Sequence, residues 1–136
     1  MILVDTTFII DCLRKKEKAL EFLKNKNDFI STSEINIFEI LVGIYGSTKL
    51  ATNPHLLDSR IEELENFLLK FEVFDFDRNA SLAAAKILGQ LKLKGKPVEI
   101  RDAMIAGIAL SKGIKTIVTQ NIKHFSRIPQ LAVITY

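Results

Sequence analysis

Residues 1–7 read Met-Ile-Leu-Val-Asp-Thr-Thr, so four apolar side chains are followed at once by three polar ones. A short, unbroken apolar run is typical of a strand that is buried on both faces of a parallel sheet. Asp5 therefore lies at the carboxyl end of the first predicted strand. Open parallel sheets bind their ligands beyond the carboxyl ends of the strands, which makes Asp5 the first candidate for a functional residue.

The sequence beyond residue 7 alternates short apolar strands with stretches whose apolar residues recur at helical spacing. This alternation predicts a parallel sheet with helices on both faces. The fold class that we expect is α/β, a three-layer α/β/α domain around a central parallel sheet of about five strands. We predict strands at residues 1–4, 28–31, 73–76, 116–119 and 132–135, helices at residues 8–13, 19–23, 35–45, 57–71, 78–94 and 99–112, a loop at 46–54 and a turn at 120–121.

The chain has 136 residues, 48% of them apolar and 26% charged, which fits a single domain over residues 1–136. A domain of this size buries a core without disulfides. Its one cysteine, Cys12, cannot form an internal disulfide and favours a reducing compartment. The longest uncharged apolar stretch, residues 103–110, is too short to span a bilayer, and no secretory signal is visible. We therefore expect a soluble, cytoplasmic protein that does not enter a membrane.

Basic residues exceed acidic ones by 19 to 16, which gives a net charge of +3. So small an excess permits a polyanionic partner without requiring one. One basic cluster occupies residues 14–18, and a second lies around residues 92–101. The second cluster is suited to hold the phosphates of a nucleic acid, and its alternative interpretation is a solvated helix end. Its members are Lys92, Lys94, Lys96 and Arg101.

The helix predicted at residues 35–45 carries large apolar side chains around most of its circumference. One stripe along this helix has no large apolar side chain, and Glu39 carries its single carboxylate. Glycine in a helix costs about 1 kcal/mol relative to alanine, so the glycines of this stripe indicate that a backbone or a ligand approaches closely. The alternative is an ordinary solvated stripe. The stripe consists of Asn36, Glu39, Gly43 and Gly46.

Asp102 interrupts a second apolar helix, predicted at residues 99–112, and lies on the same line of that helix as Ala106 and Ala109. A helix that is apolar nearly all round is buried. An unpaired ionised carboxylate in such surroundings costs several kcal/mol unless it is paired, protonated or bound to a metal. The alternative is a first-turn charge that interacts favourably with the helix dipole.

Asp5, Glu39 and Asp102 come from three separate segments, and a fold brings them together only if a cation or a shared proton relieves their repulsion. Asp5 taken alone is also explained as a helix cap. The two histidines, His55 and His124, are isolated in the sequence and show no paired spacing. The predicted site is therefore made of oxygen ligands, which suits Mg²⁺ or Mn²⁺. Such ions support phosphodiester hydrolysis, because they activate water and neutralise charge on the phosphate.

Four short motifs extend this pattern along the chain. Residues 3–7 read LVDTT, residues 39–43 EILVG, residues 102–109 DAMIAGIA and residues 119–125 TQNIKHF, the last followed by IPQL at 128–131. In this order and spacing they resemble the PIN-domain ribonucleases, and more closely the VapC-type toxins of type II toxin-antitoxin pairs. The resemblance implies an endoribonuclease that depends on Mg²⁺, with Mn²⁺ as the alternative ion.

The resemblance also implies roles for single residues. Asp5, Glu39 and Asp102 would be the catalytic acids that hold the metal, with Thr119 beside them. Asn121, otherwise interpreted as a turn residue, stands where many members have a fourth acid, and we take it as a neutral oxygen ligand. A second metal position is less negative in consequence. Further from the metal, Glu99 would be an additional acid. The residues that would bind RNA are Lys92, Lys94, Lys96 and Arg101.

The partners that the resemblance implies are an RNA substrate (tRNA, rRNA or mRNA), a VapB-like antitoxin and a second copy of the chain in a homodimer. Three other interpretations stay open: a catalytically silent PIN-like RNA-binding module, a housekeeping PIN nuclease, and a haloacid-dehalogenase-like phosphatase. The phosphatase needs a second Asp two residues after the first, where this chain has Thr7. An amphipathic antitoxin segment would bind an apolar groove formed with the helix at 56–71. The other groove residues that we expect are Phe8, Ile9, Cys12 and Leu13.

Overall fold

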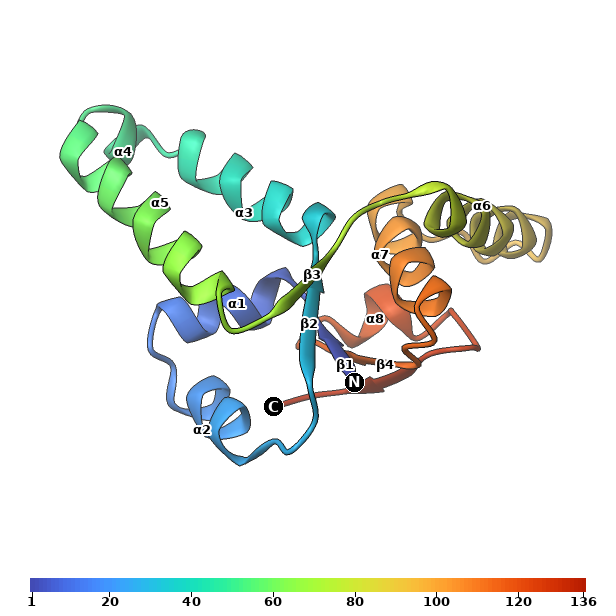
Figure 1. Ribbon diagram of the computed structural model, residues 1–136. Coiled ribbons are helices and arrows are strands. Elements are labelled where there is room, and N and C mark those ends of the chain that lie inside the picture. The colour runs from blue at the N-terminus through green and yellow to red at the C-terminus, as the bar shows by residue number, and fades with distance from the viewer.

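Five short strands form one parallel sheet in the computed structural model, which describes residues 1–136 (Figure 1). They are β1 (Ile2–Val4), β2 (Ile30–Ser33), β3 (Glu72–Phe74), β4 (Thr116–Val118) and β5 (Ala132–Ile134). The order across the sheet is β3-β2-β1-β4-β5, so β1 is central and the chain order reverses beside it. Leu3 of β1 aligns with Ser31 of β2 and with Ile117 of β4. This topology confirms the predicted parallel sheet of five strands.

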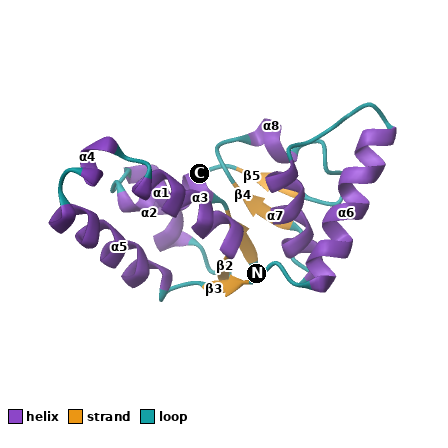
Figure 2. Ribbon diagram, turned by 90° about the horizontal axis from the view of Figure 1, so that it is seen from above, coloured by secondary structure: helices purple, strands orange, loops and turns teal.

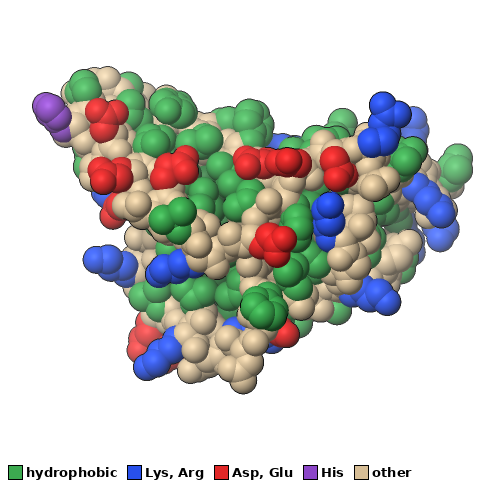
Figure 3. Space-filling model, viewed as in Figure 1, with side chains coloured by type: hydrophobic (Ala, Val, Ile, Leu, Met, Phe, Trp, Pro, Cys, Tyr) green, Lys and Arg blue, Asp and Glu red, His purple; other side chains and the backbone are tan.

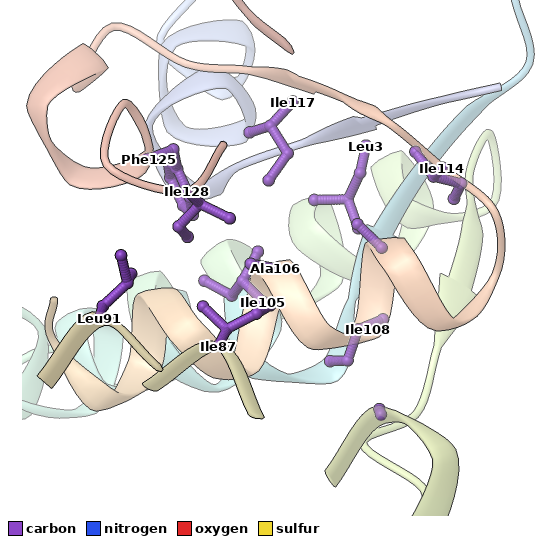
Figure 4. Close-up of a cluster of buried hydrophobic side chains, with 12 residues drawn as sticks. Leu3, Ile87, Leu91, Ile105, Ala106, Ile108, Ile114, Ile117, Phe125 and Ile128 are labelled. Carbon is purple, nitrogen blue, oxygen red and sulfur yellow. The ribbon is translucent and has the colours of Figure 1, made fainter. Parts of the chain in front are cut away.

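Eight helices cover both faces of the sheet (Figures 1 and 2). They are α1 (Thr6–Leu13), α2 (Glu17–Asn25), α3 (Glu34–Tyr45), α4 (Thr48–Ala51), α5 (Pro54–Leu68), α6 (Arg78–Leu93), α7 (Ile100–Ser111) and α8 (Ile122–Phe125). Leu3 packs in the buried cluster beneath α6 and α7, which Figure 4 shows, whereas Ile2 and Val4 pack beneath α1 and α5. The predicted three-layer α/β/α arrangement is therefore confirmed. None of the helices combines the length and the apolarity that crossing a bilayer requires.

Strand β2 lies further along the chain than the predicted residues 28–31. Three of its four side chains are polar but fully buried, because their hydroxyl groups are hydrogen-bonded, two of them to the neighbouring strand. The hydroxyl of Ser31 donates to the carbonyl oxygen of Ile2 at 2.9 Å, and that of Thr32 donates to the carbonyl oxygen of Val4 at 3.0 Å. A search for apolar residues misses a strand that is buried in this way.

Two short helices were not predicted: one lies within the segment expected to be a loop, and the other follows the turn predicted at residues 120–121. Helix α4 begins after Ser47, whose hydroxyl accepts a hydrogen bond from the Leu50 amide at 3.3 Å. Helix α8 follows Asn121 directly and buries Phe125 against the cluster beneath α6 and α7. Each has only four residues, too few to display a helical period in the sequence.

Helix α3 is apolar around most of its circumference, and such a helix is expected to be buried. It is less buried than this pattern predicts. It packs against α1, α5 and α7 on its inner side. On its outer side Phe38, Val42 and Tyr45 keep 56%, 53% and 63% of their surface exposed. These three residues form an apolar stripe that no other part of the chain covers.

Helices α6 and α7 approach each other closely at Gly107. A Cβ atom at this position would lie 2.6 Å from the carbonyl oxygen of Ala80 and 2.7 Å from the Cβ atom of Ala84. Only glycine allows the two backbones to come so near. This contact determines where α7 lies, and α7 carries Asp102 in its first turn.

We predict that Gly107→Ala lowers the free energy of unfolding by about 1–3 kcal/mol, because the added methyl group forces the two helices apart. Urea denaturation followed by circular dichroism measures the change. Gly89→Ala is the matched control, since Gly89 is an exposed residue of α6 with no atom within 4 Å of the added Cβ. The control should be as stable as the parent protein or more so. Equal stability of both variants would contradict the close contact.

Candidate metal centre

Asp5 lies between β1 and α1, with 5% of its surface exposed. Its Oδ1 atom accepts hydrogen bonds from the Phe8 amide at 3.1 Å and from the Thr7 hydroxyl at 2.7 Å, so Asp5 caps α1. Its Oδ2 atom accepts a hydrogen bond from the Thr119 hydroxyl. Burial raises the pKa of Asp5 although these hydrogen bonds oppose the shift. The cap that we considered as the alternative is thus present, and the carboxylate still faces the switch point of the sheet.

Thr119 joins two strand ends at this point. The residue is fully buried directly after β4, and besides donating to Asp5 its hydroxyl accepts a hydrogen bond from the Asn121 amide at 2.9 Å. Thr119 thereby connects Asp5 with the backbone of Asn121. The Asn121 side chain makes no capping hydrogen bond to α8 and is exposed.

Glu39 reaches the same place from α3. Its Oε1 atom accepts a hydrogen bond from the Thr6 hydroxyl at 3.2 Å, and its Oε2 atom lies 3.5 Å from Nη1 of Arg101. Asn36, fully buried on the same stripe of α3, donates from Nδ2 to the Thr6 hydroxyl at 3.2 Å. Asn36 and Glu39, the polar residues of the stripe, therefore contact the first turn of α1. Gly43, in contrast, has no atom within 4 Å of a built Cβ, so the expected close approach of a backbone is not found there.

Asp102 is the third acid, in the first turn of α7 and only 8% exposed. Burial raises its pKa, and the nearby charge of His124 opposes this shift. Burial also raises the pKa of Glu39, and the charges of Asp102 and Asp5 add to the increase. Burial thus disfavours the ionised form of all three carboxyl groups, and the negative charges of Asp5 and Asp102 in addition repel the ionised Glu39. A divalent cation would relieve this repulsion.

His124 is the residue that the sequence interpretation missed. Its Nδ1 atom lies 3.1 Å from Oδ2 of Asp102. Glu99, Asp102 and His124 offer ligand atoms that all lie within 4.8 Å of one another. His124, which is isolated in the sequence, therefore lies next to an acid in the folded chain. The short helix α8 places it there, and a sequence reading without α8 gives no reason to bring residue 124 to Asp102.

The basic residues lie near the acids, and one of them, Arg101, contacts Glu39. Lys94 and Lys96 line a cavity of about 570 Å³ together with Arg127. Arg127 also lines a smaller cavity of about 180 Å³ that contains Asp102. Figure 3 shows Lys and Arg side chains gathered over the end of the molecule formed by α6. Of the four residues predicted to bind RNA, Lys92 is exposed on α6, Lys94 and Lys96 line the larger cavity, and Arg101 pairs with Glu39.

An apolar groove with a volume of about 370 Å³ lies between α1, α3, α4 and α5, and α5 lines it with Arg60 and Glu63. Leu13 lines it as predicted, but Phe8, Ile9 and Cys12 are buried in the core instead. Helix α1 turns these three residues toward the sheet, which is why they are unavailable. The other apolar residues of the groove are Ile10, Ile40, Ile44 and Leu50.

Comparisons with known proteins agree with this architecture. The family model described as PIN domain matches residues 2–131. The tRNA(fMet)-specific endonuclease VapC of Salmonella typhimurium is 33% identical over 133 residues, which cover 96% of this chain and 94% of that protein. Ribonuclease VapC2 of Rickettsia felis is 31% identical over 133 residues, covering 95% and 92%. The solved structure of VapBC2 from Rickettsia felis, bound to a DNA fragment from its promoter, superposes with a TM-score of 0.85 at 26% identity, covering 100% of this chain and 99% of that one.

We predict that Asp102→Asn stabilises the metal-free protein at pH 7. The pKa of Asp102 is raised in the folded state, so the ionised carboxyl opposes folding, and this cost grows as the pH rises above the unfolded value of 3.8. The gain in free energy of unfolding should therefore be smaller at pH 4 than at pH 7. Urea denaturation in a chelator at both pH values measures it. Asp58→Asn, at an exposed acid of α5, serves as the control and should show no such trend.

Proposed function

The chain belongs to the PIN-domain family and to the VapC group within it, and we propose that it is a divalent-metal-dependent endoribonuclease that acts as the toxin of a toxin-antitoxin pair. The observation that supports the metal dependence is the convergence of Asp5, Glu39 and Asp102 at the switch point of the sheet. Burial raises the pKa of all three carboxyl groups. A bound cation would therefore stabilise the ionised form of these carboxyl groups more than water does.

The donor set fits Mg²⁺ or Mn²⁺, because carboxylate oxygens are the ligands that these hard ions prefer. When bound, such an ion activates water and neutralises charge on the phosphate under attack. The chain itself orients the acids. Thr7 and Thr119 hold the two oxygens of Asp5, and Thr6 holds Glu39, so each carboxylate is fixed before an ion or RNA arrives.

The RNA strand would approach over the basic end of the molecule. Lys94, Lys96 and Arg127 line the larger cavity beside the acids, where they can contact phosphates without reading bases. We propose tRNA as the substrate class, since the relative that is 33% identical is named a tRNA(fMet)-specific endonuclease. We propose the cytoplasm as its location, where Cys12 stays reduced; burial raises the pKa of its thiol to about 11.

Two of the three alternative functions account less well for the acids of the site, and the third would use the same site. A module that only binds RNA gains nothing from three carboxyl groups whose ionised form is disfavoured by burial. A haloacid-dehalogenase-like phosphatase would need an acid where Thr7 stands, and here the Thr7 hydroxyl donates to Asp5. A housekeeping PIN nuclease would share the whole site, so only a cognate antitoxin distinguishes it from a toxin.

We predict that Asp5→Asn reduces Mg²⁺- or Mn²⁺-dependent RNA cleavage by at least about 100-fold, because it removes a ligand charge that the chain holds in place. Asparagine still caps a helix, so the thermal unfolding temperature should change little. Sequencing of the RNA ends that appear on induced expression measures both activity and target, with Asp58→Asn as the control. Metal-free cleavage at the full rate, or full activity of Asp5→Asn, would exclude the proposed mechanism.

The antitoxin would bind the apolar groove between α1, α3, α4 and α5. Two of the solved structures that this chain resembles are VapBC complexes, one from Rickettsia felis and one from Salmonella typhimurium at 31% identity. The groove suits the apolar face of an amphipathic helix, with Arg60 and Glu63 at its edge for polar contacts. We also propose a homodimer, supported by the exposed apolar stripe of Phe38, Val42 and Tyr45 on α3.

We predict that Gly43→Leu weakens antitoxin binding at least about tenfold, since the new side chain enters the groove and displaces part of an apolar interface. A side chain at Gly43 meets no atom within 4 Å, so the variant should fold normally. The probe is the product of a short reading frame beside this gene, co-expressed and measured by calorimetry. Gly89→Leu, on exposed α6, should bind as the parent does. Unchanged binding to Gly43→Leu would place the antitoxin elsewhere.

A further inference from the structure

The smaller cavity beside the acids has metal-binding groups of its own. It has a volume of about 180 Å³ and lies at the start of α7, next to α8. Glu99, Asp102 and His124 all line it, and their ligand atoms lie within 4.8 Å of one another. Asp5 and Glu39 do not line this cavity. Asp102 thus belongs to this group of donors and to the group proposed with Asp5 and Glu39.

We propose that Glu99, Asp102 and His124 form a second cation position that shares Asp102 with the first and prefers a divalent transition-metal ion over Mg²⁺. The proposal rests on the proposed function, because it assumes that Asp5, Glu39 and Asp102 hold the first ion. It replaces our expectation of a second position at Asn121. That residue offers a neutral amide, whereas Glu99 offers a carboxylate.

The three donors are placed to close on an ion. Two ligand atoms bound to one such ion lie no more than about 4.4 Å apart, so separations of up to 4.8 Å need only small adjustments. The buried partner, Asp102, is fixed by its helix. Glu99 and His124 are exposed and therefore free to make the adjustment.

The imidazole determines which ion is preferred. Mg²⁺ prefers oxygen ligands and keeps several waters, while imidazole nitrogen binds first-row transition-metal ions well. A site of two carboxylates and one imidazole therefore favours the transition-metal ion. Asp102 has two oxygens and can serve both positions, as carboxylates do in two-metal centres.

Two basic side chains line the same cavity and match the charge of a substrate phosphate. They belong to Lys123 and Arg127. Arg127 donates from Nη1 to the carbonyl oxygen of Pro97 at 2.8 Å, which holds its guanidinium at the cavity wall. A phosphate oxygen that entered the cavity would meet the cation and these two side chains together. The second position would thus bind both the ion and a phosphate group of the RNA.

Co²⁺ is the probe for this position, and calorimetry on the full chain is the first readout. The parent protein should bind two Co²⁺ ions. In His124→Gln the second ion should be lost or bound at least about tenfold more weakly, while the first ion stays bound. His55→Gln is the matched control, since His55 is the only other histidine and lies at the start of α5. It should bind Co²⁺ as the parent does.

Proton NMR of the Co²⁺-loaded protein is the second readout, because an imidazole bound to Co²⁺ shows a strongly shifted, exchangeable N–H resonance. This resonance should be present in the parent and in His55→Gln and absent in His124→Gln. If His124 only orients Asp102 through a hydrogen bond, the resonance is absent from the parent as well. Glu99→Gln removes an exposed acid, is expected to leave the fold intact, and should weaken the same Co²⁺ ion.

The outcomes separate this inference from the proposed function. A single Co²⁺ ion in the parent, or an unchanged affinity in His124→Gln, overturns the second position but leaves Mg²⁺-dependent cleavage and its dependence on Asp5 intact. Undiminished cleavage by Asp5→Asn overturns the proposed function, whatever Co²⁺ does at His124.

Discussion

Desolvation of three carboxyl groups, together with the repulsion that Asp5 and Asp102 exert on Glu39, is the constraint on which this structure depends. Asp5, Glu39 and Asp102 enter one region from a strand end and two helices, and burial raises the pKa of each. Such an arrangement lowers stability as long as no cation is present. It persists because the surrounding packing holds the three elements in place, and its use lies in the binding of a divalent ion.

Two kinds of contact hold the elements against this repulsion. Close packing of α6 on α7 at Gly107 fixes the helix that carries Asp102. Hydroxyl groups then orient the other two acids, Thr119 for Asp5 and Thr6 for Glu39. The hydroxyls satisfy the carboxylate oxygens without adding charge, so the negative potential remains available to a cation.

The chain also places two nitrogen-bearing side chains of its own near the acids. Arg101 lies 3.5 Å from Glu39, and His124 lies 3.1 Å from Asp102. The two differ in what they can do next. A guanidinium has no lone pair for a metal and can only pair with a carboxylate or a phosphate, whereas an imidazole can also become a ligand. This difference is why His124, and not Arg101, is placed in the second cation position.

Most of the fold was predictable from local patterns. The alternation of strands and helices predicted the parallel three-layer sheet. That Asp5, Glu39 and Asp102 form the site stays a prediction, made from the apolar segments that they interrupt. The caps at Ser33 and Asp77 are local features as well, because a cap depends on residues three positions apart. Tertiary structure alone decided the contacts between distant elements, such as Thr119 with Asp5, 114 positions away, and His124 with Asp102. Periodicity reports only which face of an element is apolar, whereas the partner of a buried polar group depends on how separate elements dock, and that docking is a property of the whole packed chain.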